Sequence, residues 1–241
     1  MKIKSRLFLF LSACICSSCI VMHVEDQDPR DYKDLVFEER EIEETYWEIS
    51  SNNGFNVYLT YSTSKTLKIQ AEESVLSKVD TYVKDGVLTI IAGRNISSTK
   101  PINVYVPYTN LNKISASTNS HLFFESPIKS NTLLLKASTG SVLNIPQVEA
   151  DHIIIDSRTK EINIAGRTRQ LEVKASGADL INAGKLVVDN CEVHLTNHSN
   201  LIVQVLHSIK GYVDKESSIE YGSPKKVNLT KEGRTTGEPR R

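Results

Sequence analysis

The folded part of this 241-residue chain has almost no cysteine. Three of the four cysteines lie within the first 19 residues, and only Cys191 remains in the rest of the sequence. A lone thiol cannot form an intramolecular disulfide. Cys191 follows Asp189 and Asn190 at the approach to a strand, where we expect a small buried thiol rather than a reactive one.

The chain also lacks an excess of charge of one sign. Its 29 Lys and Arg residues balance 29 Asp and Glu residues, and loss of Lys2, Lys4 and Arg6 with a leader would leave 26 basic residues against 29 acidic ones. Both signs are mixed throughout, without a basic stripe interleaved with aromatic residues. This pattern argues against nucleic acid as a partner.

Long apolar runs are missing as well. Positive charges within residues 1–6 precede the mainly apolar run 7–13, which is too short for a stable transmembrane span. Small residues and cysteines follow. This order predicts a signal peptide over residues 1–19 and therefore an exported protein.

The cysteines of this signal resemble a lipoprotein attachment site. Leu11-Ser12-Ala13-Cys14 matches the box that the bacterial lipoprotein signal peptidase reads, but it leaves a short apolar region. Cleavage before Cys19 gives a better length with a poorer box. We expect lipid on Cys14 or Cys19, with an ordinary cleaved signal as the alternative. A lipid would anchor the mature chain to a membrane without spanning it.

Charge density and apolar content then divide the chain. Residues 20–44 are rich in Asp, Glu, Lys and Arg, so we expect a solvated tether there. The folded body should cover residues 45–230. Residues 231–241, rich in Gly, Thr and charge, should form a disordered tail.

The strongest signal in the body is an internal repeat that begins near Leu111. One strand, one polar corner and a second strand recur six times, and the equivalent positions lie 18 to 21 residues apart: Ala116, Ala137, Ser157, Ala175, Leu195 and Val213. Apolar residues alternate with a period of two before each position, which is typical of a strand with one buried face. The repeat predicts an all-β, single-stranded parallel solenoid with rungs of about 20 residues.

The corners and the first half of the body carry turn chemistry. Corners such as Thr139-Gly140-Ser141 hold residues that tolerate left-handed dihedral angles. Strands are expected around residues 57–61, 67–71, 82–83, 87–90 and 102–106. Asp85-Gly86, between apolar strands, predicts a hairpin turn.

These motifs resemble the head GIN-domain family of putative auto-transporter adhesins, found mainly as exported proteins and lipoproteins of Bacteroides-like bacteria. The resemblance spans most of residues 47–229. It rests on Phe55–Leu59 with Leu67–Ala71, on Val83–Ile90, on Val104–Pro107 and on the closing Tyr221–Pro224. It implies a right-handed parallel β-helix-like body without established catalytic residues. Corners such as Thr118-Asn119 and Arg158-Thr159 depart from the usual Ser-Gly pair of the family.

An enzyme is the first alternative, because β-helices also carry polysaccharide lyases and hydrolases. The candidate acids are Asp151, Asp156, Asp179 and Asp189. Their positions within the rungs differ, and the short rungs leave no length for cleft walls. A phosphate-binding Gly-rich loop and a plausible nucleophile triad are both missing. His194 and His198 are four residues apart at a strand end, which does not bring them together as a helix would. We therefore expect no catalysis, metal or cofactor.

A binding role in the cell envelope remains. The resemblance implies an adhesin that binds glycan or protein through a solenoid face, attached to the outer membrane on its periplasmic or surface side. Exposed aromatic residues are the expected anchors, namely Tyr58, Tyr82, Tyr105 and Tyr108. The alternative is an architectural spacer or assembly unit. The sequence leaves the oligomeric state open.

Overall fold

The computed structural model describes residues 35–93, 96–178, 180–232 and 235–236. The predicted signal peptide with Cys14 and Cys19, residues 20–34 of the expected tether, Asp179 and most of the expected tail lie outside the described residues. Among the described residues, no helix is both long enough and apolar enough to cross a bilayer.

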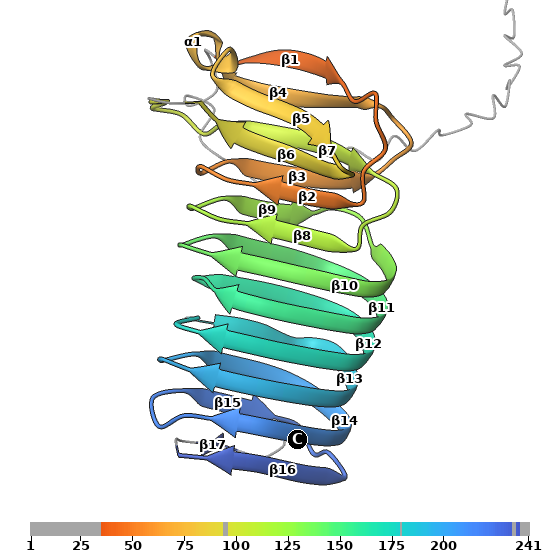
Figure 1. Cartoon of the computed structure of the whole chain (residues 1–241), viewed down its shortest axis with the longest axis vertical. Helices are drawn as coiled ribbons and strands as arrows, with labels where there is room; N and C mark the ends of the chain where they lie inside the picture. Colours follow the sequence, from red (N-terminus) through yellow and green to blue (C-terminus); the bar gives the residue numbers. More distant parts are fainter. Residues whose placement is uncertain (1–34, 94–95, 179, 233–234, 237–241) are drawn as a thin grey trace, which may run out of the picture. The chain divides into compact units, whose positions relative to one another are not determined.

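The chain folds as a β-solenoid whose strands join into one 17-stranded sheet (Figure 1). The all-β solenoid predicted from the repeat is therefore confirmed. Its first half comprises β1 (Leu35–Glu41), β2 (Glu48–Ser51), β3 (Asn56–Tyr61), β4 (Thr66–Glu72), α1 (Glu73–Leu76), β5 (Val79–Lys84), β6 (Val87–Ala92) and β7 (Asn103–Tyr108). The second half comprises β8 (Lys113–Ala116), β9 (His121–Phe124), β10 (Ile128–Ser138), β11 (Val142–Arg158), β12 (Glu161–Ser176), β13 (Leu180–Thr196), β14 (Asn200–Val213), β15 (Ser218–Tyr221), β16 (Lys226–Lys231) and β17 (Thr235–Thr236).

The six repeat positions stack in register. Each pairs in parallel with the next, from Ala116 through Ala137, Ser157 and Ala175 to Leu195 and Val213. We call the sheet through these positions the anchor sheet; it contains β2, β6, β8 and the C-terminal halves of β10–β14. The return sheet contains β4, β7, β3, β9, the N-terminal halves of β11–β14, and β15.

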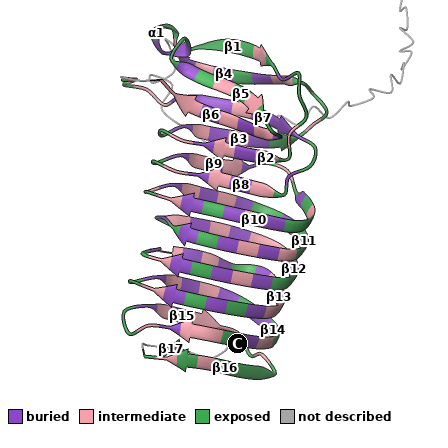
Figure 2. Cartoon of the chain, in the orientation of Figure 1, coloured by how far each residue is buried: buried purple, intermediate pink, exposed green. Residues whose placement is uncertain are grey.

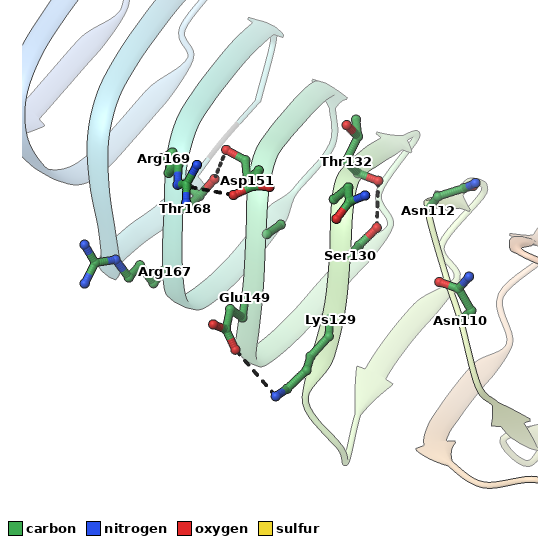
Figure 3. A pocket seen from close by; sticks show the side chains of 12 residues that line it. Asn110, Asn112, Lys129, Ser130, Thr132, Glu149, Asp151, Arg167, Thr168 and Arg169 are labelled. Atoms are coloured by element: carbon green, nitrogen blue, oxygen red, sulfur yellow. Dashed lines mark hydrogen bonds and ion pairs between the residues drawn. The ribbon is translucent and has the colours of Figure 1, made fainter.

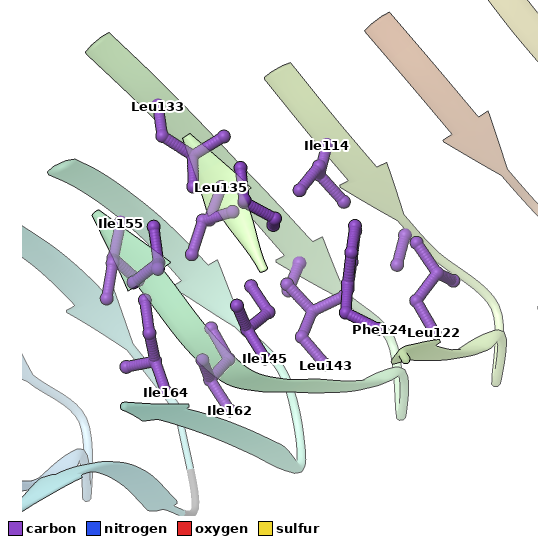
Figure 4. Packing of buried hydrophobic residues seen from close by; sticks show 14 of the residues in the cluster. Ile114, Leu122, Phe124, Leu133, Leu135, Leu143, Ile145, Ile155, Ile162 and Ile164 are labelled. Carbon is purple, nitrogen blue, oxygen red and sulfur yellow. The ribbon is translucent and has the colours of Figure 1, made fainter. Parts of the chain in front are cut away.

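The core lies between these two sheets. Ile114, Leu135 and Ile155 of the anchor sheet point toward the return sheet, where Leu122 and the equivalent apolar residues of the next turns face them (Figure 4). Buried and exposed residues alternate along the long strands, as Figure 2 shows. Complete burial of one Leu or Ile side chain contributes about 1.5–3 kcal/mol, so the stacked turns stabilise one another.

The polar corners between the sheets follow the expected turn chemistry. Thr118, Asn119, Thr139, Asn197 and His198 all have positive φ angles. The hydroxyl residues at the inner side of the corners are buried; they are Ser120, Ser141, Thr159, Ser199 and Ser217. Asp85 and Gly86 have φ angles of 51° and 75°, which fits the predicted hairpin between β5 and β6.

The N-terminal boundary differs from the expectation. Residues 35–41 of the expected tether form β1, which pairs antiparallel with β4 along its full length, and Ile42 is buried. The Arg40 guanidinium donates to the carbonyl oxygens of Val79 (2.5 Å) and Leu76 (3.0 Å). Backbone pairing and this side chain hold a strand whose sequence is mostly charged, so the tether prediction is wrong for this part.

The C-terminal boundary differs in the same way. Lys231 belongs to β16, and residues 235–236 form β17, which pairs with β15. Strand pairing therefore continues into the segment that we expected to be a disordered tail.

Candidate functional site

A concave groove of about 950 Å³ lies on the side where the return sheet bends into the anchor sheet (Figure 3). Four consecutive turns line it: Asn110 and Asn112 before β8, residues 129–132 of β10, residues 149–151 of β11 and residues 167–169 of β12. The lining side chains are almost all polar or charged.

Gly166 lies at the bend of β12, directly before the residues of this strand that line the groove. Gly166 has a φ of 128°, and a Cβ atom there would lie 2.0 Å from the Val148 carbonyl oxygen of the preceding turn. The pairing of β11 with β12 shifts register just before this point. Because only glycine permits this dihedral angle and this close approach, the sequence must place it here.

Ion pairs join neighbouring turns across the groove. Lys129 Nζ lies 3.6 Å from Glu149 Oε2, and Arg169 Nε lies 3.3 Å from Asp151 Oδ1. All four side chains are well exposed to solvent. Exposed ion pairs of this kind are weak, so a ligand with polar groups can replace either partner at low cost.

Amides and hydroxyls fill the space between these charges. Thr168 Oγ1 donates toward the carbonyl oxygens of Asp151 (3.3 Å) and Gln170 (3.0 Å), and Ser130 Oγ donates to the Thr132 carbonyl oxygen (2.8 Å). Asn110, Asn112 and Asn131 add side-chain amides, each with donors and acceptors. The groove can therefore form many hydrogen bonds to hydroxyl-rich molecules.

The structure brings together two of the four aromatic residues singled out from the sequence. Tyr58 and Tyr105 stack on the outer side of the return sheet, with ring centroids 5.2 Å apart and an interplanar angle of 17°. Phe123 stacks on the other face of Tyr58 at 5.3 Å. Because the Tyr58 ring contacts a neighbour on both faces, it presents mainly its edge to solvent and cannot stack on a sugar.

The other two tyrosines lie apart from this stack. Tyr82 is 50% exposed on β5, in the hairpin with β6. Tyr108 is only 3% exposed, and its hydroxyl donates to the Ser126 carbonyl oxygen at 2.8 Å. Burial raises the pKa of Tyr108 to about 12. The expectation of an exposed anchor is wrong for Tyr108, which points inward with Val104 and Val106.

The three candidate acids within the described residues do not form one cluster. Asp151 lines the groove, whereas Asp156 pairs in register with Lys136 and Lys174 on the outer side of the anchor sheet. Asp189 lies 3.8 Å from Arg167. Within the described ranges, no group of three His, Cys, Asp or Glu residues could hold a metal ion.

Cys191 lies in the core, as the sequence predicts. Only 2% of its surface is exposed. Burial, with a smaller contribution from Glu192, raises the pKa of its thiol to about 12. The side chain therefore remains an unreactive thiol at neutral pH.

Sequence reasoning missed the groove itself. Its residues stand about 18 to 20 positions apart and come together only when the turns stack. The available signal was the recurrence of polar residues at the same point of successive repeats, just before the anchor strand, as in Ser130–Thr132, Glu149 with Asp151, and Thr168–Arg169.

The solenoid and its groove can be compared with known proteins. The family described as putative auto-transporter adhesin, head GIN domain, matches residues 45–224. The chain belongs to this family. No curated protein matches the chain significantly.

Solved structures of other proteins share this fold. A putative adhesin from Bacteroides fragilis superposes with a TM-score of 0.77 at 19% identity, covering 85% of this chain and 96% of that one. A putative lipid binding protein from Parabacteroides distasonis gives a TM-score of 0.65 at 14% identity, over 84% and 96% of the two chains. A putative adhesin from Parabacteroides merdae gives 0.57 at 17% identity, over 84% and 95%. At these identities the likeness shows the fold alone.

Proposed function

We propose that this protein is an exported adhesin of the cell envelope, lipid-anchored through Cys14 or Cys19, that binds an extended glycan in the groove without altering it. Membership of a putative adhesin family and the lipoprotein-like N-terminus support the location. The groove supports the mode of binding.

The observation that carries this proposal is the repetition of polar side chains along the groove. Its four turns stand about 4.8 Å apart, so similar hydrogen-bonding positions recur over roughly 15 Å. A glycan chain also repeats hydroxyl groups along its length. Residues such as Asn112, Thr132, Asp151 and Arg169 would each meet successive parts of the same ligand.

The charges in the groove favour binding over hydrolysis. Glu149 stands against Lys129, and Asp151 stands against Arg169. Glycoside hydrolysis needs one protonated and one ionised carboxyl group on opposite sides of the scissile bond. Carboxylates that face cations instead are suited to accept hydrogen bonds from hydroxyl groups.

An array of bacterial and host glycans tests this function, with the full-length protein in detergent and with the amount of each glycan followed in the same wells. We expect saturable binding to at least one glycan class and no loss of the glycan. Breakdown of a glycan would contradict the non-catalytic role. No binding to any glycan would favour the architectural spacer.

The anchor needs a separate measurement. Incorporation of an alkyne-labelled fatty acid into Cys14→Ala and Cys19→Ala variants should be lost in one variant and kept in the other. Equal labelling of both variants and the parent would contradict attachment at either cysteine.

A further inference from the structure

The outer side of the return sheet carries a continuous ladder of nine side chains on nine adjacent strands, from β4 to β15. In order from the N-terminal end, these are Lys68, Tyr105, Tyr58, Phe123, Asn144, Asn163, Asn182, Ile202 and Glu220. We call this set the return-sheet ladder. It is separate from the groove, which lies where the return sheet bends into the anchor sheet.

The return-sheet ladder differs sharply in charge from the outer side of the anchor sheet. There, Glu172 pairs with Lys174 at 2.8 Å and Glu192 with Lys210 at 2.9 Å. In the return-sheet ladder, the seven residues between Lys68 and Glu220 are all uncharged; beside it lies the Glu161 carboxylate, which accepts a hydrogen bond from Asn163 at 2.8 Å. Depletion of charge and enrichment in aromatic residues are typical of the central part of a protein–protein interface.

Side-chain size changes along the ladder. The N-terminal half carries the stacked rings of Tyr105, Tyr58 and Phe123. The C-terminal half carries the smaller Asn163, Asn182 and Ile202. Asn144 lies at the centre, with four ladder residues on either side. The side chains therefore extend farther from the sheet in the N-terminal half of the ladder than in the C-terminal half.

We propose that two copies of this chain associate through their return sheets, about a two-fold axis that runs parallel to the strands at the level of Asn144. Each ladder then meets the other in reverse order. Phe123 faces Asn163 of the second copy, and Tyr58 faces Asn182 of the second copy. Each of the three rings thus lies opposite a smaller side chain.

The ends of the ladder agree with this arrangement. Reverse order brings Lys68 opposite Glu220 of the second copy at both ends, so that opposite charges meet. Ladders in the same order would set Lys68 against Lys68 and ring against ring. Strand spacing is the same in both copies, so the paired positions stay aligned over the full length.

The size of the face predicts a weak dimer. Eight strand intervals of about 4.8 Å by a strand width of about 13 Å give roughly 500 Å² per copy, or about 1,000 Å² in total. This area is at the lower limit for a specific interface. Association should therefore depend on protein concentration.

Cross-linking of the full-length protein in membranes with a bismaleimide that spans about 10 Å tests the arrangement, because facing sheets lie about 10 Å apart, beyond the reach of a disulfide. Asn144→Cys places a thiol on the axis, where it can meet its own counterpart. Asp156→Cys is the matched control, because it lies in the same strand, β11, on the outer side of the anchor sheet. The parent chain gives the background from its own cysteines.

We expect the bismaleimide to link Asn144→Cys at least several-fold more than Asp156→Cys or the parent. Equal linking of the two variants would overturn the proposal. The same result is expected if a different protein covers the face, and it would overturn the proposal in that case too.

A charge exchange in the Asn144→Cys background tests the register. Lys68→Glu should lower the yield of linked dimer, and adding Glu220→Lys should restore it. Lys68 also forms an exposed ion pair with Glu39 at 2.7 Å, and Glu220→Lys cannot repair that contact. Failure of the double exchange to restore linking would therefore overturn the reversed order. Circular dichroism confirms that each variant is folded.

Discussion

Ser141 Oγ lies 2.8 Å from Thr159 Oγ1, and both hydroxyls are buried at the corner between the two sheets. Ser141 Oγ also donates toward the Ser138 carbonyl oxygen (2.8 Å), while Thr159 Oγ1 donates to the Ser141 carbonyl oxygen (2.5 Å). These bonds join two neighbouring turns where the chain reverses. They provide hydrogen-bond partners for buried polar groups of the corner that water cannot reach.

Replacement of Ser141 tests how much this contact contributes to the free energy of unfolding. Ser141→Ala leaves Thr159 and the corner carbonyls short of a partner, so we expect a loss of about 1–3 kcal/mol in the free energy of unfolding. Ser120→Ala is the matched control, because Ser120 is equally buried but its hydroxyl has no partner. Denaturant titration followed by circular dichroism measures both. A larger loss for Ser120→Ala would contradict this account.

Ser157 should respond in the opposite direction. It occupies the repeat position between Ala137 and Ala175, and its buried Oγ has no hydrogen-bond partner. Because an unpaired buried hydroxyl is costly, Ser157→Ala should raise stability by about 1 kcal/mol. The melting temperature measures the change. A lower melting temperature than the parent would show that the hydroxyl has a favourable contact.

Arg40 tests whether β1 is part of the fold. Its guanidinium reaches the carbonyls of Leu76 and Val79 and the Thr81 hydroxyl (3.1 Å). Arg40→Leu should cost about 2–4 kcal/mol, because charged hydrogen bonds to half-buried groups are lost. Lys210→Leu removes an exposed ion pair and should cost less than about 1 kcal/mol. If the two variants lowered the free energy of unfolding equally, β1 would contribute little to stability, as expected of a solvated tether.

Gly166 tests the bend that forms the groove. Gly166→Ala would bring a Cβ to 2.0 Å from the Val148 carbonyl oxygen, so the backbone must move. At Gly177, where φ is 74°, a Cβ atom would lie 3.8 Å from the Asn197 carbonyl oxygen, so there is room for it. Gly177→Ala should cost about 1 kcal/mol and Gly166→Ala clearly more. Similar melting temperatures for the two variants would contradict the close approach.

The parts of the fold that side-chain periodicity encodes were predictable. Alternation before Ala116 and its equivalents fixes both the strands and their register, because a shift of one residue would turn the apolar side chains outward. The same alternation, applied beyond Val104 and Val106, would have placed Tyr108 inside.

Other parts had no such signal. β1 is held by backbone pairing with β4 and by Arg40, and neither leaves an apolar pattern in Leu35–Glu41. Charged residues are common on edge strands, where they discourage further pairing. The groove combines short polar segments from four turns. Its shape depends on the bend at Gly166, which the sequence alone does not place in space.

Binding affinity in matched double variants tests the groove most directly. The ligand is the strongest glycan from the array, titrated into full-length protein. Lys129→Ala with Arg169→Ala removes two of the three groove cations and leaves Arg167, whereas Lys174→Ala with Lys210→Ala removes two cations from the outer side of the anchor sheet. We predict at least tenfold weaker binding for the groove variant, about 1.4 kcal/mol, and unchanged binding for the other. Equal affinities for the two double variants would contradict binding in the groove.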